Sequence, residues 1–213
     1  SVDASSFQET LSLSLGEKFN PVGLGVSPEG LRAVVLGRSD KRPEEKKEQP
    51  PADVKGLDRV IFRQQHDQRG SKIADVALLT GTAVIQQSWY GAGNIKNIAV
   101  SASDAFIQPF GQETARITGG EVGIIDSGGR SHYGATMSRD LSTVISGGLR
   151  QITMKPLASD ATQEIKLDRL PGWPEYITRF AHLPDGRILA GTTAYRLIVV
   201  DPASGTFDAH PVN

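Results

Sequence analysis

The sequence contains no cysteine, which excludes disulfide bonds, thiolate catalysis and any metal site with cysteine ligands. It also lacks the Asn-x-Ser/Thr sequon, so nothing in it indicates a glycosylated, secreted form. No apolar run approaches the roughly 20 residues that a membrane-spanning helix requires. We therefore expect a soluble protein without membrane insertion, and the compartment is left open, because cytosolic and periplasmic proteins can both lack cysteine.

The chain also has no excess of positive or negative charge. The chain has 23 basic and 24 acidic side chains, a formal net charge of -1. No overall field would draw it onto DNA, RNA or an anionic membrane, so we expect no nucleic-acid partner. With 213 residues, 38% of them hydrophobic, the chain can build one good-sized core, and we expect a single domain over residues 1–213.

One segment, Ser39 to Val54, differs from the rest in composition. It reads SDKRPEEKKEQPPADV, has no apolar periodicity, and carries opposite charges that nearly cancel. Such a segment cannot bury enough apolar surface to fold by itself. We expect residues 39–54 to be a charged surface-loop insertion within the domain.

The remaining sequence consists of short apolar runs separated by Gly, Asp, Ser and Pro. Runs of five to eight residues that are rich in Val and Ile are typical of strands. Long amphipathic helical patterns are absent. The pattern therefore predicts an all-β protein.

Four of these segments share one pattern of strand, tight turn and second strand. They are VGLGVSPEGLRAVVLG (Val22 to Gly37), KNIAVSASDAFIQPFG (Lys96 to Gly111), YGATMSRDLSTVISGG (Tyr133 to Gly148) and TRFAHLPDGRILAG (Thr178 to Gly191). The residues of the turns suit type I geometry, in which Asp and Ser bond to the local backbone. We expect four antiparallel hairpins with equivalent turns at Ser27, Ser101, Ser138 and Leu183–Pro184.

A third strand and a second turn follow most of these hairpins. The predicted third strands are Asp58 to Gln65, Gly120 to Asp126 and Tyr195 to Asp201. The anchoring turn positions lie 74, 37 and 45 residues apart, and the first interval contains the charged insertion. A repeating unit of about 40 to 50 residues explains this spacing.

Three or four antiparallel strands joined by hairpins form one blade of a β-propeller. The segment LPDGRILAGTTAYRLIVVDPASGTF (Leu183 to Phe207), supported by SPEGLRAVVLG (Ser27 to Gly37), resembles the β-propeller repeat superfamily of WD40-like, YVTN and gluconolactonase-like proteins. The resemblance implies a small or partial β-propeller of about four blades, built from antiparallel hairpins. The chain lacks the Gly-His and Trp-Asp dipeptides of WD40 repeats, so the resemblance concerns architecture.

The same strands also permit other arrangements. A β-sandwich is the alternative fold class. Within the propeller hypothesis, four blades could close into a compact ring or form part of a larger ring. The alternating segment Glu9 to Leu15 predicts one more strand before the first unit, and Thr206 to Asn213 is expected to begin the outer strand of the last unit or to be that strand.

The string IIDSGGR (Ile124 to Arg130) resembles two protease motifs. In aspartic proteases an Asp-Ser-Gly turn supplies one of two carboxylates, so Asp126 would require a homodimeric partner. In chymotrypsin-type enzymes Ser127 would be the nucleophile, but the only upstream histidine, His66, lies in a polar run. We expect instead that the string is a turn between strands of the repeat.

The remaining candidates for a metal or a cofactor are weak. The four histidines, at positions 66, 132, 182 and 210, include no i, i+4 pair. The Gly-rich strings match neither the P-loop nor the GxGxxG pattern. We therefore expect no metal site and no cofactor.

Aromatic residues are scarce, at 6%, yet both tryptophans and three of the four tyrosines fall between successive repeat units. The connections between propeller blades lie on one face around the axis, where ligands usually bind. The predicted partner-binding residues in these connections are Trp89, Tyr90, Arg130, His132, Tyr133, Trp173, Glu175 and Tyr176. Packing of these rings between blades is the competing explanation.

The leading functional hypothesis is a non-catalytic interaction module. In this hypothesis the propeller, or part of one, binds a protein partner or other subunits of a larger assembly through one face. A propeller hydrolase, lyase or quinoprotein-type enzyme is the second hypothesis, and a homodimeric aspartic protease that uses Asp126 is the third.

Overall fold

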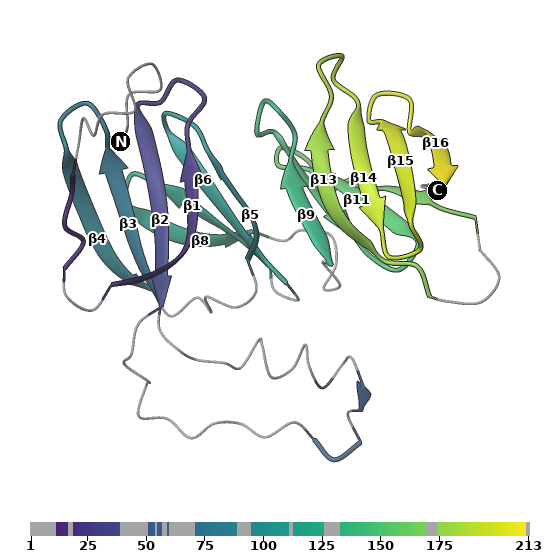
Figure 1. Cartoon of the computed structure of the whole chain (residues 1–213), viewed down its shortest axis with the longest axis horizontal. Coiled ribbons are helices and arrows are strands. Elements are labelled where there is room, and N and C mark those ends of the chain that lie inside the picture. The colour runs from purple at the N-terminus through teal and green to yellow at the C-terminus, as the bar shows by residue number, and fades with distance from the viewer. Residues whose placement is uncertain are drawn as a thin grey trace.

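The computed structural model describes residues 12–16, 19–38, 51–53, 55–56, 59, 71–88, 95–110, 113–125, 133–168 and 174–211. In this part of the chain four antiparallel sheets of four strands each follow one another, and every sheet uses consecutive strands in chain order (Figure 1). We number the sheets 1 to 4 from the N-terminal side.

The strands of the first two sheets extend to residue 125. Sheet 1 contains β1 (Asn20–Val26), β2 (Arg32–Arg38), β3 (Ser71–Ala77) and β4 (Thr82–Ser88). Sheet 2 contains β5 (Ile95–Val100), β6 (Asp104–Pro109), β7 (Thr114–Thr118) and β8 (Glu121–Ile125).

The strands of the last two sheets begin at residue 134. Sheet 3 contains β9 (Gly134–Met137), β10 (Thr143–Gly147), β11 (Gln151–Pro156) and β12 (Gln163–Lys166). Sheet 4 contains β13 (Ile177–His182), β14 (Ile188–Thr192), β15 (Arg196–Asp201) and β16 (Thr206–Pro211).

The four predicted hairpins are present and form the first two strands of each sheet. In every turn the backbone N–H of the anchoring residue donates a hydrogen bond that closes the hairpin, at 2.7 or 2.8 Å: Ser27 to Arg32, Ser101 to Asp104, Ser138 to Thr143 and Leu183 to Arg187. The serine hydroxyls add local bonds, as when Ser138 Oγ accepts from the Thr143 N–H at 2.9 Å. The turn chemistry read from the sequence therefore defines equivalent positions in the four sheets.

The third strands agree less well with the prediction. The third strand of sheet 1 is β3, which pairs with β2 along its whole length. The predicted strand at residues 58–65 is wrong in this role, and all of that stretch except Arg59 lies outside the described residues. In sheet 2 the segment Glu121–Ile125 is the fourth strand, since β7 precedes it. The prediction for sheet 4 is correct, because β15 and β16 are its third and outer strands.

The sheets pack in series, with an apolar cluster at each junction. The inner strands β1, β5, β9 and β13 lie against one another in that order. Leu36 and Ile107 belong to the cluster between sheets 1 and 2, Phe106 and Met137 to that between sheets 2 and 3, and Met154 packs with sheet 4. This serial arrangement is that of a β-propeller, so the β-sandwich alternative is wrong.

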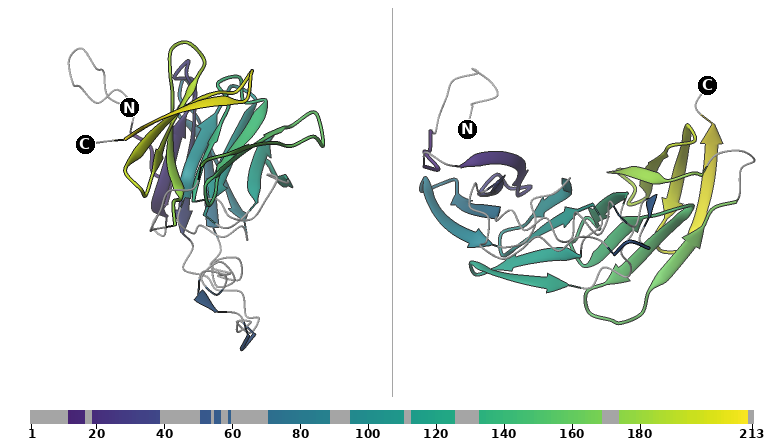
Figure 2. Two further views of the ribbon diagram at one scale, coloured as in Figure 1. Left: turned by 90° about the vertical axis from the view of Figure 1, so that its right-hand side faces the viewer. Right: turned by 90° about the horizontal axis from the view of Figure 1, so that it is seen from below.

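The four sheets form an open arc. Viewed from below, sheet 1 lies at one end of the arc and sheet 4 at the other, and the two do not meet (Figure 2). A compact four-bladed closed ring is therefore not what these residues form. The described part of the predicted strand at residues 9–15 is not paired in a sheet. Instead Leu13 and Leu15 pack on the outward side of sheet 1.

Close approach of the inner strands depends on glycine. A Cβ placed at Gly25 of β1 would lie 2.6 Å from Ile98 Cγ2 and 2.8 Å from the Ile98 carbonyl oxygen of β5. A Cβ at Gly134 of β9 would lie 2.7 Å from the backbone of Thr178 in β13. Real Cβ atoms do not approach this closely, so these positions set the distance between blades.

The charged insertion lies largely outside the described residues. Of residues 39–54 only Pro51, Ala52 and Asp53 are described, and all three are exposed. The expectation that this segment is a surface insertion in a single domain stays a prediction.

Candidate functional site

Three of the predicted partner-binding residues, Tyr133, Glu175 and Tyr176, lie at one end of the sheets, where the chain crosses from one sheet to the next. We call it the crossover end; the inner strands begin there, and the turns anchored by Ser27, Ser101, Ser138 and Leu183 lie at the opposite end. Tyr133, Glu175 and Tyr176 are described. The other predicted site residues lie outside the described part: Trp89, Tyr90, Arg130, His132 and Trp173.

Tyr133 and Tyr176 come together across two sheets. Tyr133 immediately precedes β9 and Tyr176 immediately precedes β13, and their ring centroids are 4.1 Å apart with an interplanar angle of 31°. Phe110, which follows β6, contacts the Tyr133 ring edge-on at 5.1 Å. Three rings from sheets 2, 3 and 4 thus form one continuous aromatic row, of which Phe110 is buried and the tyrosines are half-buried.

A lysine extends this row on the side of sheet 2. The ammonium group of Lys96 lies 5.3 Å from the centroid of the Phe110 ring, a cation–π distance. The register between β5 and β6 shifts between Ile95 and Asn97, so Lys96 occupies a β-bulge. Bulges re-aim a side chain, and this one directs Lys96 over the aromatic ring.

Two effects lower the pKa of Lys96. Burial lowers the pKa of Lys96, and the positive charge of Arg179 at the start of β13 lowers it further. Neither Lys96 nor Arg179 forms an ion pair with a carboxylate in the described part of the chain. Lys96 of sheet 2, which lies over Phe110, and Arg179 of sheet 4 are thus close enough for their positive charges to interact.

Glu175 serves a different purpose from its aromatic neighbour. Its side chain is fully buried and accepts two hydrogen bonds from Arg196, from Nε at 2.9 Å and from Nη2 at 2.5 Å. Burial raises the pKa of Glu175, but hydrogen bonds from Arg196 and Thr192 and the charge of Arg196 outweigh it and lower the pKa overall. The carboxylate is thus ionised and already paired, so it positions Tyr176 by fixing the connection that carries it.

Sequence reasoning missed Phe110, Lys96 and Arg179, because all three lie within or beside repeat strands. It also missed Tyr195, which lies in the turn between β14 and β15 at the crossover end and is 80% exposed. Tyr195 has a φ of 56°, uncommon for a residue other than glycine. Of these four residues, only Tyr195, an aromatic residue in a turn, could have been identified from the sequence.

The catalytic and metal-binding candidates receive no support from geometry. Asp126, Ser127, His66 and His132 lie outside the described residues. His182 lies 3.4 Å from Thr136 Oγ1 between sheets 3 and 4, and His210 is exposed on β16. Among the residues that are described, no three His, Asp or Glu side chains gather closely enough to hold a metal ion.

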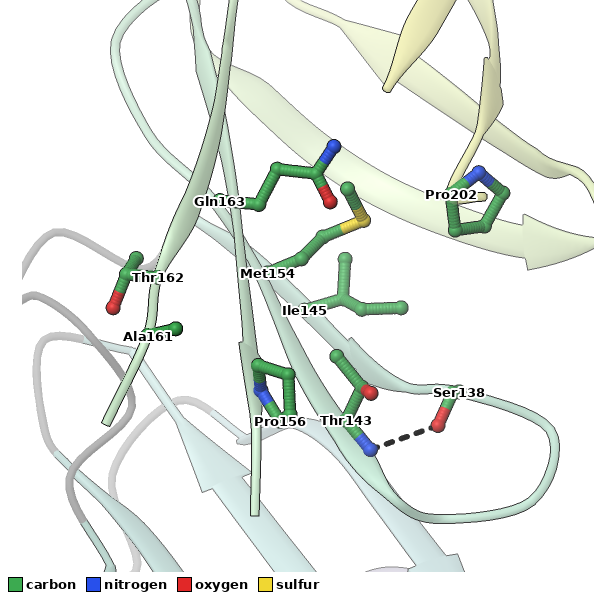
Figure 3. A pocket seen from close by; sticks show the side chains of 9 residues that line it. All are labelled: Ser138, Thr143, Ile145, Met154, Pro156, Ala161, Thr162, Gln163 and Pro202. Carbon is green, nitrogen blue, oxygen red and sulfur yellow. Dashed lines mark hydrogen bonds between the residues drawn. The ribbon is translucent and has the colours of Figure 1, made fainter. Parts of the chain in front are cut away.

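A pocket of about 350 Å³ opens between sheets 3 and 4 near their hairpin turns (Figure 3). Ile145, Met154 and Pro156 form its apolar wall, and Gln163 and Pro202 lie on either side. No charged side chain lines it. The pocket is part of the space between two diverging blades. It has few polar groups with which to bind a specific ligand.

No helix in the described ranges is long and apolar enough to cross a membrane. Comparison with family models gave no match, and comparison with curated proteins gave none either.

Solved structures do match the fold. Hydrazine synthase from Kuenenia stuttgartiensis aligns with a TM-score of 0.59 at 13% identity, over 100% of this chain and 59% of that chain. BamB from Moraxella catarrhalis aligns with a TM-score of 0.55 at 13% identity, over 90% and 53%. The dihydro-heme d1 dehydrogenase NirN in complex with DHE aligns with a TM-score of 0.60 at 12% identity, over 100% and 41%.

These structures are propeller-like, and at such low identity the likeness shows the fold alone. The chain is thus an all-β protein of propeller architecture, and no particular propeller family is identified. It spans less than two thirds of the length of each of these three structures.

Proposed function

We propose that this chain is a non-catalytic interaction module that binds an acidic segment of a protein partner at its crossover end. The observation that carries the proposal is the contact of Tyr133 with Tyr176, which joins two sheets into a half-buried aromatic surface. Lys96 lies beside this surface and Arg179 is close enough to lower the pKa of Lys96, and neither has a carboxylate partner among the described residues. A surface of this composition matches a partner that offers both apolar side chains and carboxylates.

General energetics supports aromatic rings as binding anchors. Tyrosine and arginine are enriched among the few interface residues that contribute most of the binding free energy. A tyrosine presents a large apolar area at little cost in conformational entropy. Carboxylates that approach Lys96 and Arg179 would also relieve the repulsion between these two cations.

The proposal is tested with wild-type protein and a Tyr176→Ala variant as parallel baits. A partner recovered by the wild type from its native source is identified by mass spectrometry, and its Kd is measured for both proteins. We expect Tyr176→Ala to raise Kd at least tenfold, about 1.4 kcal/mol, while circular dichroism shows that the variant keeps the fold. Higher salt should also raise Kd, because cations contribute to the surface.

Leu79→Ala provides the matched control. Leu79 is 80% exposed in the turn between β3 and β4, at the opposite end of the sheets, so its removal should leave Kd unchanged. Inter-blade packing predicts the reverse for Tyr176→Ala, namely a lower melting temperature with an unchanged Kd. That result, or an equal loss of affinity in the Leu79 variant, would refute the proposal.

A further inference from the structure

The two ends of the arc expose opposite kinds of sheet face. Each sheet has an upstream face, toward the preceding sheet, and a downstream face, toward the next one. At all three internal junctions a downstream face packs on an upstream face. In the described part of the chain no further sheet packs on the upstream face of sheet 1 or on the downstream face of sheet 4 (Figure 2).

The inner strand of sheet 1 presents apolar side chains whose counterparts in sheets 2 and 3 are buried. Val26 directly precedes the turn residue Ser27, as Val100 precedes Ser101 and Met137 precedes Ser138. Val100 is 4% exposed and Met137 1%, because each packs toward the preceding sheet, whereas Val26 is 48% exposed. Leu24 on the same face is 63% exposed. The inner part of this face therefore has the apolar residues of a junction between two blades, but no preceding blade packs on it in the described part of the chain.

The outer part of the same face is already covered. Leu13 and Leu15 pack against Ala74 and Val76 of β3, while Ser12 and Ser14, which alternate with them, are exposed. The open face of sheet 1 is therefore apolar on its inner strand and polar over its outer strands.

The downstream face of sheet 4 is apolar on its middle strands and polar on its outer strand. Ile188 and Val200 pack toward sheet 3, so the alternate residues Leu189 and Val199 face outward. Leu197, on the same side of β15, is 39% exposed. The corresponding outward positions on the outer strand β16 are polar and include Asp208 and His210. The inner strand β13 carries Arg179 and Ala181 on this face, so the apolar area of the face lies mainly on the middle strands β14 and β15.

We propose that two copies of this chain associate head to tail, sheet 4 of each on sheet 1 of the other, and close a ring of eight sheets. Each new junction would be downstream face on upstream face, as the three junctions within the chain are. Leu24 and Val26 would then be buried by Ala181, Leu189 and Leu197 of the second copy. The segment 12–16 would fill the space between the outer strands, where neighbouring blades diverge.

This inference names one subunit of the larger assembly, and it rests on the sheet faces at the two ends of the arc. Arg179 lies beside Gly191 on the same face of sheet 4 as Leu197, whereas the contact of Tyr133 with Tyr176 is not part of that face. The inference does not rest on binding at Tyr176, so the two proposals fail separately. Tyr176→Ala should leave the assembly unchanged.

The native mass of the full chain, measured by light scattering after size-exclusion chromatography, tests the proposal. We expect twice the chain mass of 22.8 kDa, and dissociation on dilution. Leu24→Asp and Leu197→Asp should each weaken self-association at least 100-fold, because each places a charge in both junctions of the ring. Circular dichroism should show that both variants keep the fold, since both side chains are exposed in the single chain.

Two further measurements sharpen the result. Leu79→Asp, the same change at an exposed leucine away from both faces, should leave the mass unchanged. An equimolar mixture of the Leu24→Asp and Leu197→Asp variants should partly recover the dimer, because one of its two junctions then has both faces intact.

A wild-type chain that remains monomeric at high concentration would overturn the proposal. Open polymers larger than two chains would overturn the closed ring, and the absence of recovery in the mixture would overturn the head-to-tail contact. A dimer that both aspartate variants preserve would show that another surface is used.

Discussion

Glu175 and Arg196 form a buried ion pair at the junction of sheets 3 and 4. Arg196 Nε lies 2.9 Å from Glu175 Oε1 and Nη2 lies 2.5 Å from Oε2, with the side chains 13% and 0% exposed. The backbone of Glu175 accepts a further hydrogen bond from the Arg150 N–H of sheet 3 at 2.9 Å. Glu175 thus forms hydrogen bonds with sheet 3 through its backbone and with sheet 4 through its side chain, and Tyr176 follows it directly in the chain.

Removing this carboxylate should destabilise the fold. Glu175→Ala leaves the guanidinium of Arg196 buried without its partner, and we expect a loss of about 3 kcal/mol in the free energy of unfolding. Urea denaturation followed by circular dichroism measures it. Asp185→Asn removes the charge from the exposed pair with Arg187 but keeps an acceptor for the Arg187 N–H of the turn, so it should cause no measurable change. Equal losses in the two variants would contradict the special role of the buried pair.

Stability should fall on acidification, with Asp104 as one source. Hydrogen bonds from Arg116 and Thr118 lower the pKa of Asp104 from 3.8 to about 2. The unfolded chain therefore takes up a proton at a higher pH than the folded chain, and the stability contributed by this carboxylate is lost as the pH falls from about 4 through 2. Glu175, whose pKa is also lowered, acts in the same direction.

The test is a series of urea denaturations between pH 5 and pH 2. Asp104→Asn should reduce the dependence of the unfolding free energy on pH in this range. Arg116→Gln should reduce it similarly, because Arg116 is the main cause of the lowered pKa. An unchanged slope in both variants would show that Asp104 contributes nothing to the acid dependence.

The spacing of blades 1 and 2 should depend on Gly25. In Gly25→Ala the new methyl group would meet Ile98 and Val100 at 2.6 to 2.8 Å, partly against backbone. Overpacking of this kind costs about 1–3 kcal/mol, which thermal or urea denaturation would detect. Gly123→Ala on β8 is the control, since a Cβ there meets nothing within 4 Å. A Gly25 variant as stable as the control would mean that the two blades can separate without cost.

Deletion of residues 39–54 should change the melting temperature little. The segment has almost no apolar side chain to bury, and long surface insertions cost little loop entropy. Differential scanning calorimetry of the deleted and full-length chains checks this. A large decrease would mean that the segment packs against the sheets or a partner.

Much of the repeat could be read from the residues, while details of the strands could not. The turns at Ser27, Ser101 and Ser138 were predictable because their backbone bonding is local. The third strand of sheet 1 was misplaced because residues 58–65 and 71–77 are both short, apolar-containing runs, and only pairing with β2 distinguishes them. The role of Glu175 was not predictable, because its partner Arg196 lies 21 residues away in another strand.

The sequence by itself determined the all-β class, the four hairpins and the placement of Tyr133 and Tyr176 between repeats, since turn chemistry and alternation act over a few residues. Only the tertiary structure decided that the blades form an open arc and that Lys96 faces Phe110 across a bulge. It alone also decided which apolar side chains, such as Leu24, are left exposed at the ends. These features depend on contacts between residues far apart in the chain, and a local pattern carries no information on how closely two distant strands pack.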